Sequence, residues 1–494
     1  ERAFFAADLT AAIQQLADVL RQFGDTPAAG RADTLLPQVL RTLQLERMEV
    51  RNRPVPDIPR PTLHFTCSTW MNDPNGLLFH DGTWHLFFQT NPDGPDWGNL
   101  SWGHATSTDL VHWEEQPVAL RVEPGELVFS GSAVADTANT AGFAGPGETA
   151  LVAIYTSHHV PPSPRSGTQA QSLAYSLDGG TTWTRYPGNP VLDLAMQDFR
   201  DPKVFWWEAD GAGHWVMATV DPPGRRVLLH TSPNLRDWTA ASTFAPANPP
   251  GGIWECPDLF PLEADGETHW VLVVSVNPGG VAGGSGAAYV VGDFDGTTFT
   301  ATGDFGWLDF GRDHYAPVSF SGVPEGRRLM VGWASNWDYA AAAPPTSWRS
   351  AMSFVREIGL VADDGVPRVV QRPVVPLDDP ALAVAELTAP VVPGRVTDGV
   401  VSTADGAARV VVTVDGDRRE LRLDRRRSGV VDFHPAFPSV DVAPLPPGDE
   451  VDLTVIADGS LVEVFAAGGR VTMVAQVFPL APLTEVHVVE QRTS

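Results

Sequence analysis

Short apolar segments bounded by Gly, Asp or Pro fill the sequence between about residue 65 and residue 360, and no sustained helical pattern interrupts them. The clearest of these segments are Trp84–Gln89, Ala150–Tyr155, Trp215–Val220, Trp270–Val276 and Arg328–Trp333. Segments of this kind are typical of β-strands joined by turns. The 46 glycines and 44 prolines among 494 residues are scattered between the segments, as many tight turns require. The sequence therefore predicts an all-β fold.

A loose repeat within this region favours one all-β architecture. In each copy a polar turn precedes an aromatic residue that can pack between strands: Ser107–Leu110 before Trp113, Ser176–Gly180 before Trp183, Ser232–Leu235 before Trp238, and Asp293–Gly296 before Phe299. Consecutive aromatic residues are roughly 55 to 70 positions apart, which suits the four-stranded blade of a β-propeller.

The two ends of the sequence differ from this middle region. Apolar residues near the start recur at helical spacing, at Leu9, Ile13, Leu16 and Leu20. We therefore expect a short helical N-terminal extension over residues 1–50, either packed on the main domain or used for oligomerisation. Residues 51–370 are expected to form the propeller. Beyond the proline-containing segment Val366–Asp379, strand-like segments return, so residues 371–494 are expected to form a linker and a C-terminal β-sandwich.

The charge balance excludes several classes of partner. Lys and Arg number 33 and Asp and Glu number 60, which gives a net charge of −27. A surface this acidic repels phosphate backbones and anionic lipid, so we expect no nucleic-acid partner. No apolar run approaches the roughly 20 residues that span a bilayer, so we expect no membrane partner. The chain starts at Glu1 and not at Met; removal of a secretory signal is one explanation and a shortened chain is the other, and we expect a secreted protein.

Cysteine and histidine do not indicate a metal or a cofactor. Cys67 and Cys256 could form one disulfide at most, and we expect two buried thiols instead of a disulfide framework or a zinc site. The histidines are scattered without ligand spacing, so no catalytic metal is expected. Lysine occurs once, as Lys203.

Three acidic residues lie in turns marked by tryptophan or proline. Asp73 lies within Trp70–Gly76, where a neighbouring aromatic face resembles what a sugar pocket needs. Glu255 lies within Trp254–Asp258, and desolvation by its bulky neighbours would favour its neutral, protonated form. Taken alone, the first motif also fits a plain Asx turn, and the second fits a solvated glutamate at a strand end.

The third acidic residue is Asp201, which follows Arg200 in Phe199–Pro202. Adjacent residues of an extended strand point to opposite faces, although on a twisted edge both can reach one cavity. Alone, this motif also fits a surface turn with a local ion pair. Three such carboxylates together indicate more, because glycoside hydrolysis needs one ionised and one protonated carboxyl group on opposite sides of the scissile bond.

These motifs resemble glycoside hydrolase family 32, the β-fructofuranosidase, levanase and inulinase family, in which they occur in the same order. The resemblance extends over about residues 62 to 480 and includes further segments: Trp97–Asn99, Trp102–Ala105, Phe129–Ser132, Ser335–Trp337, Trp348–Ser350, Asp458–Ser460 and Glu463–Phe465. It implies a five-bladed β-propeller followed by a β-sandwich, and it gives no counterpart for the N-terminal extension.

The resemblance also implies roles for individual residues. Asp73 corresponds to the nucleophile, Glu255 to the acid/base and Asp201 to a group that stabilises the transition state. The fructose pocket is expected to be lined by Asn72, Gln89, Trp97, Ser130, Arg200 and Trp337. No cofactor is implied.

The expected activity is retaining hydrolysis of terminal β-D-fructofuranosyl residues of sucrose, and of fructans, through a fructosyl–enzyme intermediate. Release of fructose and transfer to sugar acceptors would accompany it, in a protein expected to be a monomer. A levanase, an inulinase or a levan fructotransferase acting mainly on polymeric fructan is the alternative. The near absence of lysine speaks against a phosphate pocket and hence against phosphorylated sucrose. The non-enzymatic alternatives are a propeller that binds carbohydrate without catalysis and an adhesion protein.

Overall fold

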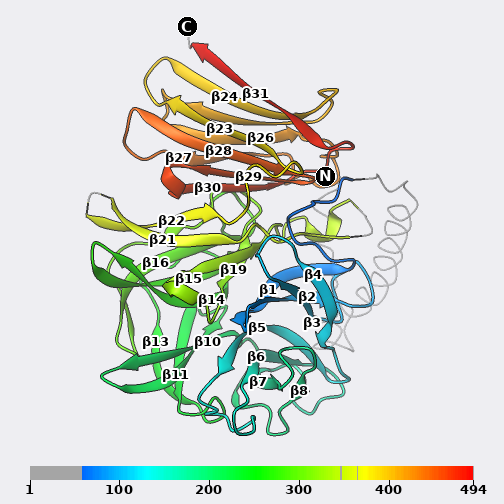
Figure 1. Ribbon diagram of the computed structural model, residues 1–494, viewed down its shortest axis with the longest axis vertical. Helices are drawn as coiled ribbons and strands as arrows, with labels where there is room; N and C mark the ends of the chain where they lie inside the picture. Colours follow the sequence, from blue (N-terminus) through cyan, green and yellow to red (C-terminus); the bar gives the residue numbers. More distant parts are fainter. Residues whose placement is uncertain (1–57, 345–347, 364, 493–494) are drawn as a thin grey trace, which may run out of the picture.

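The computed structural model describes residues 58–344, 348–363 and 365–492. They form five sheets arranged around an axis and two further sheets packed against each other (Figure 1). The all-β prediction is thus confirmed: the helices in the described residues are three short 3₁₀ turns, Pro324–Gly326, Ala340–Ala342 and Ala467–Gly469. The predicted helical extension over residues 1–50 lies outside the described residues.

Each propeller blade is an antiparallel sheet whose first strand is innermost. Blade 1 comprises β1 (Trp70–His80), β2 (Thr83–Asn91), β3 (Ser101–Ser107) and β4 (Glu114–Leu120). Blade 2 comprises β5 (Glu126–Asp136), β6 (Ala150–His159), β7 (Gln169–Ser176) and β8 (Thr184–Arg185), with β9 (Leu192–Met196) also paired to β7. Blade 3 comprises β10 (Arg200–Ala209), β11 (Ala212–Asp221), β12 (Arg226–Ser232) and β13 (Thr239–Phe244).

The remaining two blades follow the same order. Blade 4 comprises β14 (Ile253–Ala264), β15 (Glu267–Asn277), β16 (Gly286–Phe294) and β17 (Phe299–Ala301), with β18 (Gly306–Trp307) also paired to β16. Blade 5 comprises β19 (Tyr315–Ser319), β20 (Leu329–Trp333), β21 (Arg356–Asp363) and β22 (Val366–Pro373).

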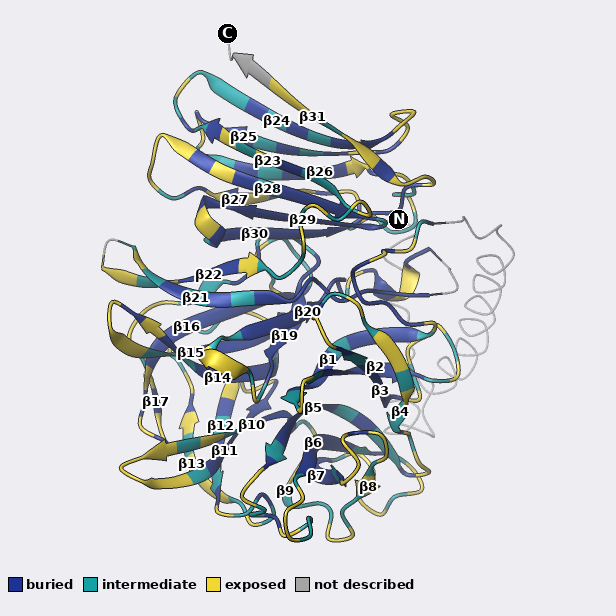
Figure 2. Ribbon diagram, in the orientation of Figure 1, coloured by how far each residue is buried: buried dark blue, intermediate teal, exposed yellow. Residues whose placement is uncertain are grey.

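The five inner strands close into a ring around the axis. Strand β1 contacts β5, β5 contacts β10, β10 contacts β14, β14 contacts β19, and β19 contacts β1 (Figure 1). Backbone hydrogen bonds join blade 5 to blade 1, because Ser321 donates to Leu77 and accepts from Phe79, both at 2.9 Å. The inner strands are largely buried, whereas most residues of the outer strands β9 and β13 are exposed (Figure 2). Residues distant in sequence therefore share one axial space.

The sequence repeat corresponds to the turn between the third and fourth strands of a blade. In blade 1 the Ser107 hydroxyl accepts the N–H of Leu110, and the Trp113 indole donates to the Leu110 carbonyl at 3.2 Å. Blades 2 and 3 repeat the indole contact, from Trp183 to Gly180 and from Trp238 to Leu235. In these three blades the tryptophan thus closes the turn that leads into the outer strand, which is why the motif recurs along this part of the sequence.

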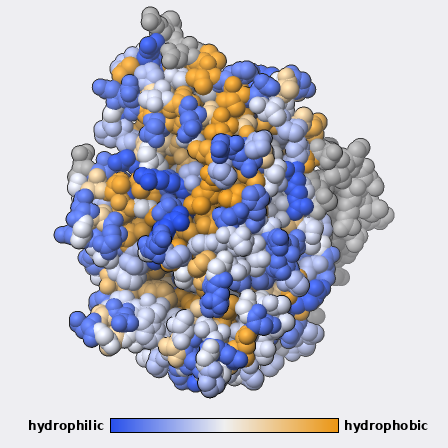
Figure 3. Space-filling view, viewed as in Figure 1, coloured by the Kyte–Doolittle hydropathy of each residue, from blue (hydrophilic) through white to orange (hydrophobic). Residues whose placement is uncertain are grey.

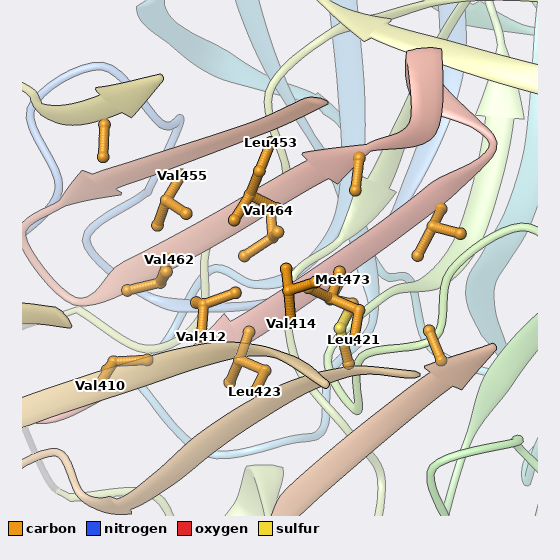
Figure 4. Packing of buried hydrophobic residues seen from close by; sticks show 14 of the residues in the cluster. Val410, Val412, Val414, Leu421, Leu423, Leu453, Val455, Val462, Val464 and Met473 are labelled. Carbon is orange, nitrogen blue, oxygen red and sulfur yellow. The ribbon is translucent and has the colours of Figure 1, made fainter. Parts of the chain in front are cut away.

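The last two sheets form the predicted β-sandwich. One has the order β23 (Ala383–Pro390), β28 (Glu450–Asp458), β29 (Leu461–Ala466) and β30 (Val471–Gln476). The other has the order β27 (Val440–Pro444), β26 (Glu420–Arg427), β25 (Arg409–Asp415), β24 (Arg395–Thr403) and β31 (Leu483–Arg492). Alternate side chains of both sheets meet in an aliphatic core that includes Val412, Leu423, Leu453 and Val464 (Figure 4). Such alternation places one face of each strand in the core.

A buried group of charged side chains joins the sandwich to the propeller. Arg356 of β21 donates to Glu463 of β29 at 2.8 Å and to Asp309 at 3.1 Å. The His64 ring lies 2.9 Å from Asp458 and 3.2 Å from Glu463. These five residues, the interdomain cluster, explain why Asp458–Ser460 and Glu463–Phe465 stand out in the sequence.

Hydropathy varies over the surface of the described residues (Figure 3). None of the helices in the described residues has the length and hydropathy to cross a bilayer. On the face seen in Figure 3, hydrophilic side chains are widespread, and hydrophobic ones gather near the junction of sandwich and propeller.

Candidate active site

Each inner strand is interrupted by a β-bulge near its first residues. The register shifts fall between Met71 and Pro74, Phe129 and Gly131, Arg200 and Lys203, Glu255 and Asp258, and Tyr315 and Val318. A bulge inserts an unpaired residue and turns side chains away from strict alternation. Asp73, Ser130, Asp201 and Cys256 are among the residues inside four of these bulges, so the bulges turn candidate side chains toward the axis.

The bulge in β10 resolves how Arg200 and Asp201 can serve one cavity. Strict alternation would send the two side chains to opposite faces. Asp201 instead has a φ of 63°, and the Arg200 Nε lies 4.0 Å from Asp201 Oδ2. Both side chains reach β14: Arg200 binds Glu255, and Asp201 Oδ2 accepts the backbone N–H of Cys256 at 2.8 Å.

Glu255 is held from two sides. Its Oε1 accepts hydrogen bonds from Arg200 Nε at 3.1 Å and from a terminal nitrogen of Arg200 at 3.0 Å. Its Oε2 is hydrogen-bonded to the hydroxyl of Tyr315, the first residue of β19. The side chain remains 20% exposed, so it can exchange a proton with solvent or substrate.

Asp73 lies on the other side of Cys256. Ser130 Oγ donates to Asp73 Oδ2 at 2.7 Å, and the Asn72 amide donates to Oδ1 at 3.1 Å. The Cys256 thiol lies 3.5 Å from the same Oδ2. Cys256 therefore links the three carboxylates, because its thiol contacts Asp73, its backbone N–H contacts Asp201, and it follows Glu255 in the chain.

The electrostatics of this group are unbalanced. Asp73, Asp201, Glu255 and Arg200, the axial cluster, place three carboxylates beside one guanidinium. Burial, and then the charge of Glu255, raise the pKa of Asp73, which its three hydrogen-bond donors only partly offset. Burial also raises the pKa of Asp201, as do Glu255 and Asp73, against the opposing charge of Arg200. The site therefore retains protons at a pH where ordinary aspartates have lost them.

Arg200 is fixed by residues outside the carboxylate group. Its other terminal nitrogen donates to Asp198 at 2.9 Å and to Gln169 at 3.3 Å. The guanidinium thus bridges Glu255 and Asp198 and is largely buried. A cation that is anchored in this way keeps its position when substrate enters.

The other sequence-predicted pocket residues lie at different depths. Trp70 donates its indole N–H to Asn72 at 2.8 Å and stacks on Trp337, with ring centroids 6.2 Å apart. Trp337 therefore lies near Asp73 only indirectly: it stacks on Trp70, and Trp70 is hydrogen-bonded to Asn72, the residue before Asp73. Gln89 bonds to the Val128 carbonyl of β5 at 3.0 Å, and within the described residues neither Gln89 nor Trp97 hydrogen-bonds to a carboxylate of the axial cluster. Trp97 is 51% exposed on the β2–β3 connection.

Sequence reasoning missed Tyr315 and Asp198, and it treated Cys256 only as a neighbour of Glu255. The expectation that both cysteines are buried free thiols is confirmed. Cys256 could have been suspected from its place in the motif, whereas Tyr315 has no local signal beyond opening a short apolar strand. Its position at the head of the fifth inner strand becomes informative only when that strand closes the ring.

A buried cation braces the inner strands below the carboxylates. Lys203 donates to Asp258 at 3.2 Å and to the Ser319 carbonyl at 2.6 Å, which ties β10, β14 and β19 together. A cavity of about 10 Å³ next to it has room for about one water. Among the described residues no group of three or more His, Cys, Asp or Glu has the arrangement of a metal site.

Comparison with family models shows what kind of protein carries the axial cluster. Residues 64–373 match the glycosyl hydrolases family 32 N-terminal domain, and residues 397–494 match the family 32 C-terminal domain. The chain belongs to glycosyl hydrolase family 32. It is thus a glycoside hydrolase, and the sequence resemblance to this family is confirmed.

Individual relatives agree with this assignment. The extracellular exo-inulinase of Aspergillus niger is 41% identical over 482 residues, covering 85% of this chain and 89% of the relative. The levanase of Bacillus subtilis (strain 168) is 44% identical over 459 residues, covering 85% of this chain and 66% of the relative. The crystal structure of exo-inulinase from Aspergillus awamori superposes with a TM-score of 0.79 at 38% identity, covering 88% of this chain and 96% of that one.

Proposed function

We propose that the protein is a retaining β-fructofuranosidase that removes terminal β-D-fructofuranosyl residues from sucrose and from fructans. The observation that carries this proposal is the convergence of Asp73, Asp201 and Glu255 from three blades onto Cys256 at the axis of the propeller. A family 32 hydrolase with this convergence has the carboxylates that glycosidic cleavage requires.

In the proposed reaction, a carboxylate oxygen of Asp73 attacks C2 of the fructosyl unit. The bond from C2 to the leaving oxygen breaks, and Glu255 gives its proton to that oxygen. In the second half, ionised Glu255 takes a proton from water, the water oxygen attacks C2, and Asp73 leaves as a carboxylate. Each half inverts C2, so the overall result is retention.

The surrounding groups suit these roles. Asp73 accepts hydrogen bonds from Ser130 and Asn72, which stabilise a carboxylate that must be ionised to attack. Burial and the charge of Glu255 raise the pKa of Asp73 and thus oppose its ionisation, and these two hydrogen bonds offset part of that effect. Glu255 is held by its contacts with Arg200 and Tyr315. Asp201 would accept hydrogen bonds from hydroxyl groups of the fructosyl unit, and these bonds would strengthen as positive charge develops on the sugar ring.

Levan and inulin are proposed as substrates on the same footing as sucrose. Relatives named exo-inulinase and levanase align over 85% of this chain, so their similarity includes the sandwich as well as the propeller. An enzyme that acts mainly on levan or inulin is therefore the alternative within the same chemistry. Secretion belongs to the proposal too, since several of these relatives are named extracellular.

The deciding experiment is a product profile. The enzyme is incubated with sucrose, levan and inulin, with and without methanol or lactose as acceptor. We expect free fructose, and in methanol we expect the β-configured methyl fructofuranoside, because the configuration at C2 is retained. An α-configured product, or absence of fructose release from all three substrates, would overturn the proposal. Light scattering of the same sample tests the expected monomer.

A further inference from the structure

A second cavity, of about 450 Å³, lies between blades 3 and 4. Its walls are the connection from β13 to β14 and the segment that runs from β17 into β18. A volume of this size falls in the range of about 300–1,000 Å³ that is typical of small-molecule sites. The glycosidic reaction proposed above does not use this cavity.

The lining combines aromatic rings with polar side chains that have no hydrogen-bond partner among the described residues. Phe305 and Trp307 are half-buried, so their rings form part of the wall. Asn248 and Asp304 are exposed, and within the described part of the chain neither side chain makes a hydrogen bond or an ion pair. An aromatic face beside a free amide and a free carboxylate can bind the C–H face and the hydroxyl groups of a sugar.

The charge of the cavity lining disfavours anionic ligands. No Lys, Arg or His is among the residues that line the cavity, and the chain as a whole carries a net charge of −27. A phosphorylated or carboxylated ligand would therefore be repelled. A neutral polyhydroxylated chain fits both the aromatic faces and the unpaired polar groups.

The cavity adjoins the strand that carries Glu255. The connection from β13 enters β14 at Ile253, two residues before Glu255. Trp254 donates its indole N–H to the carbonyl of Pro250 at 3.3 Å and packs edge-on against Phe305, with centroids 5.7 Å apart. Pro250 and Phe305 both line the cavity, so one buried indole lies between its wall and the acidic residue of the axial pocket.

We propose that this cavity is an accessory binding site for neutral fructan, which holds fructosyl units of a polymer remote from the unit being cleaved. The inference rests on the proposed function and names polymeric fructan as the substrate class that this surface serves. Sucrose, which has a single fructosyl unit, would not use the site.

The test compares polymer with sucrose in matched variants. Trp307→Ala is expected to lower kcat/KM on inulin and levan about fivefold, the ratio that corresponds to loss of about 1 kcal/mol of aromatic contact, and to leave sucrose hydrolysis unchanged. Asp304→Ala is an exposed change that leaves the core intact, and it should lower the polymer activity in the same direction. Trp206→Ala, which removes an exposed tryptophan on β10, is the matched control and should change neither activity.

A binding measurement separates affinity from turnover. In a Glu255→Gln background with saturating fructose in the axial pocket, electrophoresis through gels that contain levan should still retard the chain, and Trp307→Ala should reduce that retardation. Unchanged polymer kinetics and unchanged retardation in both Trp307→Ala and Asp304→Ala would overturn the accessory site. Wild-type hydrolysis of sucrose alongside that result would leave the proposed function standing, whereas no fructose release from any substrate would overturn the function itself.

Discussion

The axial cluster and the interdomain cluster are both buried groups of acidic side chains, and the pKa values of acidic residues in the two clusters are shifted in opposite directions. In the axial cluster, burial and mutual repulsion raise the pKa of Asp73 and Asp201. In the interdomain cluster, burial alone would raise the pKa of Glu463, but Arg356 and His64 lower it to about 2. Acidic side chains thus repel one another in the axial cluster, whereas in the interdomain cluster they form ion pairs that hold the two domains together.

The difference follows from the number of cations and from what each group must do. The interdomain cluster has an arginine and a histidine for its carboxylates, and buried charges that are fully paired hold the two domains in register. The axial cluster has Arg200 alone and leaves hydrogen-bonding capacity for a substrate. A site that transfers a proton requires carboxyl groups with shifted pKa values, and an excess of negative charge around a carboxyl group raises its pKa.

The largest expected effect is on turnover in the axial cluster. Asp73→Asn and Glu255→Gln should each lower kcat on sucrose by at least about 10³-fold, because each removes a group that takes part in bond breaking in the proposed reaction. Glu255→Gln should still bind fructose. Thermal unfolding should show an unchanged or higher Tm, because a neutral amide relieves repulsion. Residual activity above one tenth of wild type would contradict the assigned roles.

The second expected effect is on stability in the interdomain cluster. Glu463→Gln removes the charge of one of the two carboxylates that pair with Arg356 and also a carboxylate that contacts His64, so the free energy of unfolding should fall by about 3–5 kcal/mol in denaturant titrations. The kcat/KM of the folded fraction should stay within about twofold of wild type. Glu386→Gln, an exposed change on β23, is the control and should shift stability by less than about 0.5 kcal/mol. Equal losses in the two variants would remove the distinction between the clusters.

The third prediction concerns pH, and the two clusters should respond with opposite sign. Because the folded-state pKa of Glu463 is lowered from 4.5 to about 2, its stabilisation is present above pH 4.5 and is lost as pH falls toward 2. The pKa of His64 is raised through its bonds to Asp458 and Glu463, against the effect of burial, so its stabilisation is complete below pH 6.5 and is lost as pH rises through the folded-state value.

The aspartates of the axial cluster act in the reverse sense to Glu463. The raised pKa of Asp201 means that ionisation costs more in the folded state, so stability is lost as pH rises from 3.8 through the folded-state value. Denaturant titrations between pH 3 and 8 should therefore show Asp201→Asn gaining on wild type as pH rises, while the deficit of Glu463→Gln shrinks as pH falls. Parallel curves for both variants would contradict the comparison.

The smallest expected effect concerns the hydroxyl of Tyr315. Tyr315→Phe removes the hydrogen bond to Glu255 Oε2 without changing ring volume, so kcat should fall about tenfold, with KM within about twofold. Steady-state kinetics on sucrose measure both constants. Tyr289→Phe is the matched control and should leave both constants unchanged; Tyr289 lies in blade 4, and its hydroxyl accepts the backbone N–H of Val369 in blade 5. An equal loss in the control would assign the effect to packing.

Much of the fold could be predicted because its signals are local. Strand length, the turn residues and the indole that closes each outer turn depend on a few neighbouring positions, so the repeat at Trp113, Trp183 and Trp238 was legible in the sequence. The motifs around Asp73, Asp201 and Glu255 identified the family for the same reason. Their catalytic roles stay predictions, as do the domain limits.

The tertiary structure alone decided how those residues meet. Side chains from β1, β10, β14 and β19 approach one another only when the ring closes, and the bulges that aim them depend on pairing with the next strand. No short window of sequence could show that Tyr315 would contact Glu255 or that Cys256 would link all three carboxylates. The charge around a buried carboxylate likewise comes from segments that are distant in the sequence. Only the folded structure therefore shows which buried carboxylates have raised pKa values and which form ion pairs between the domains.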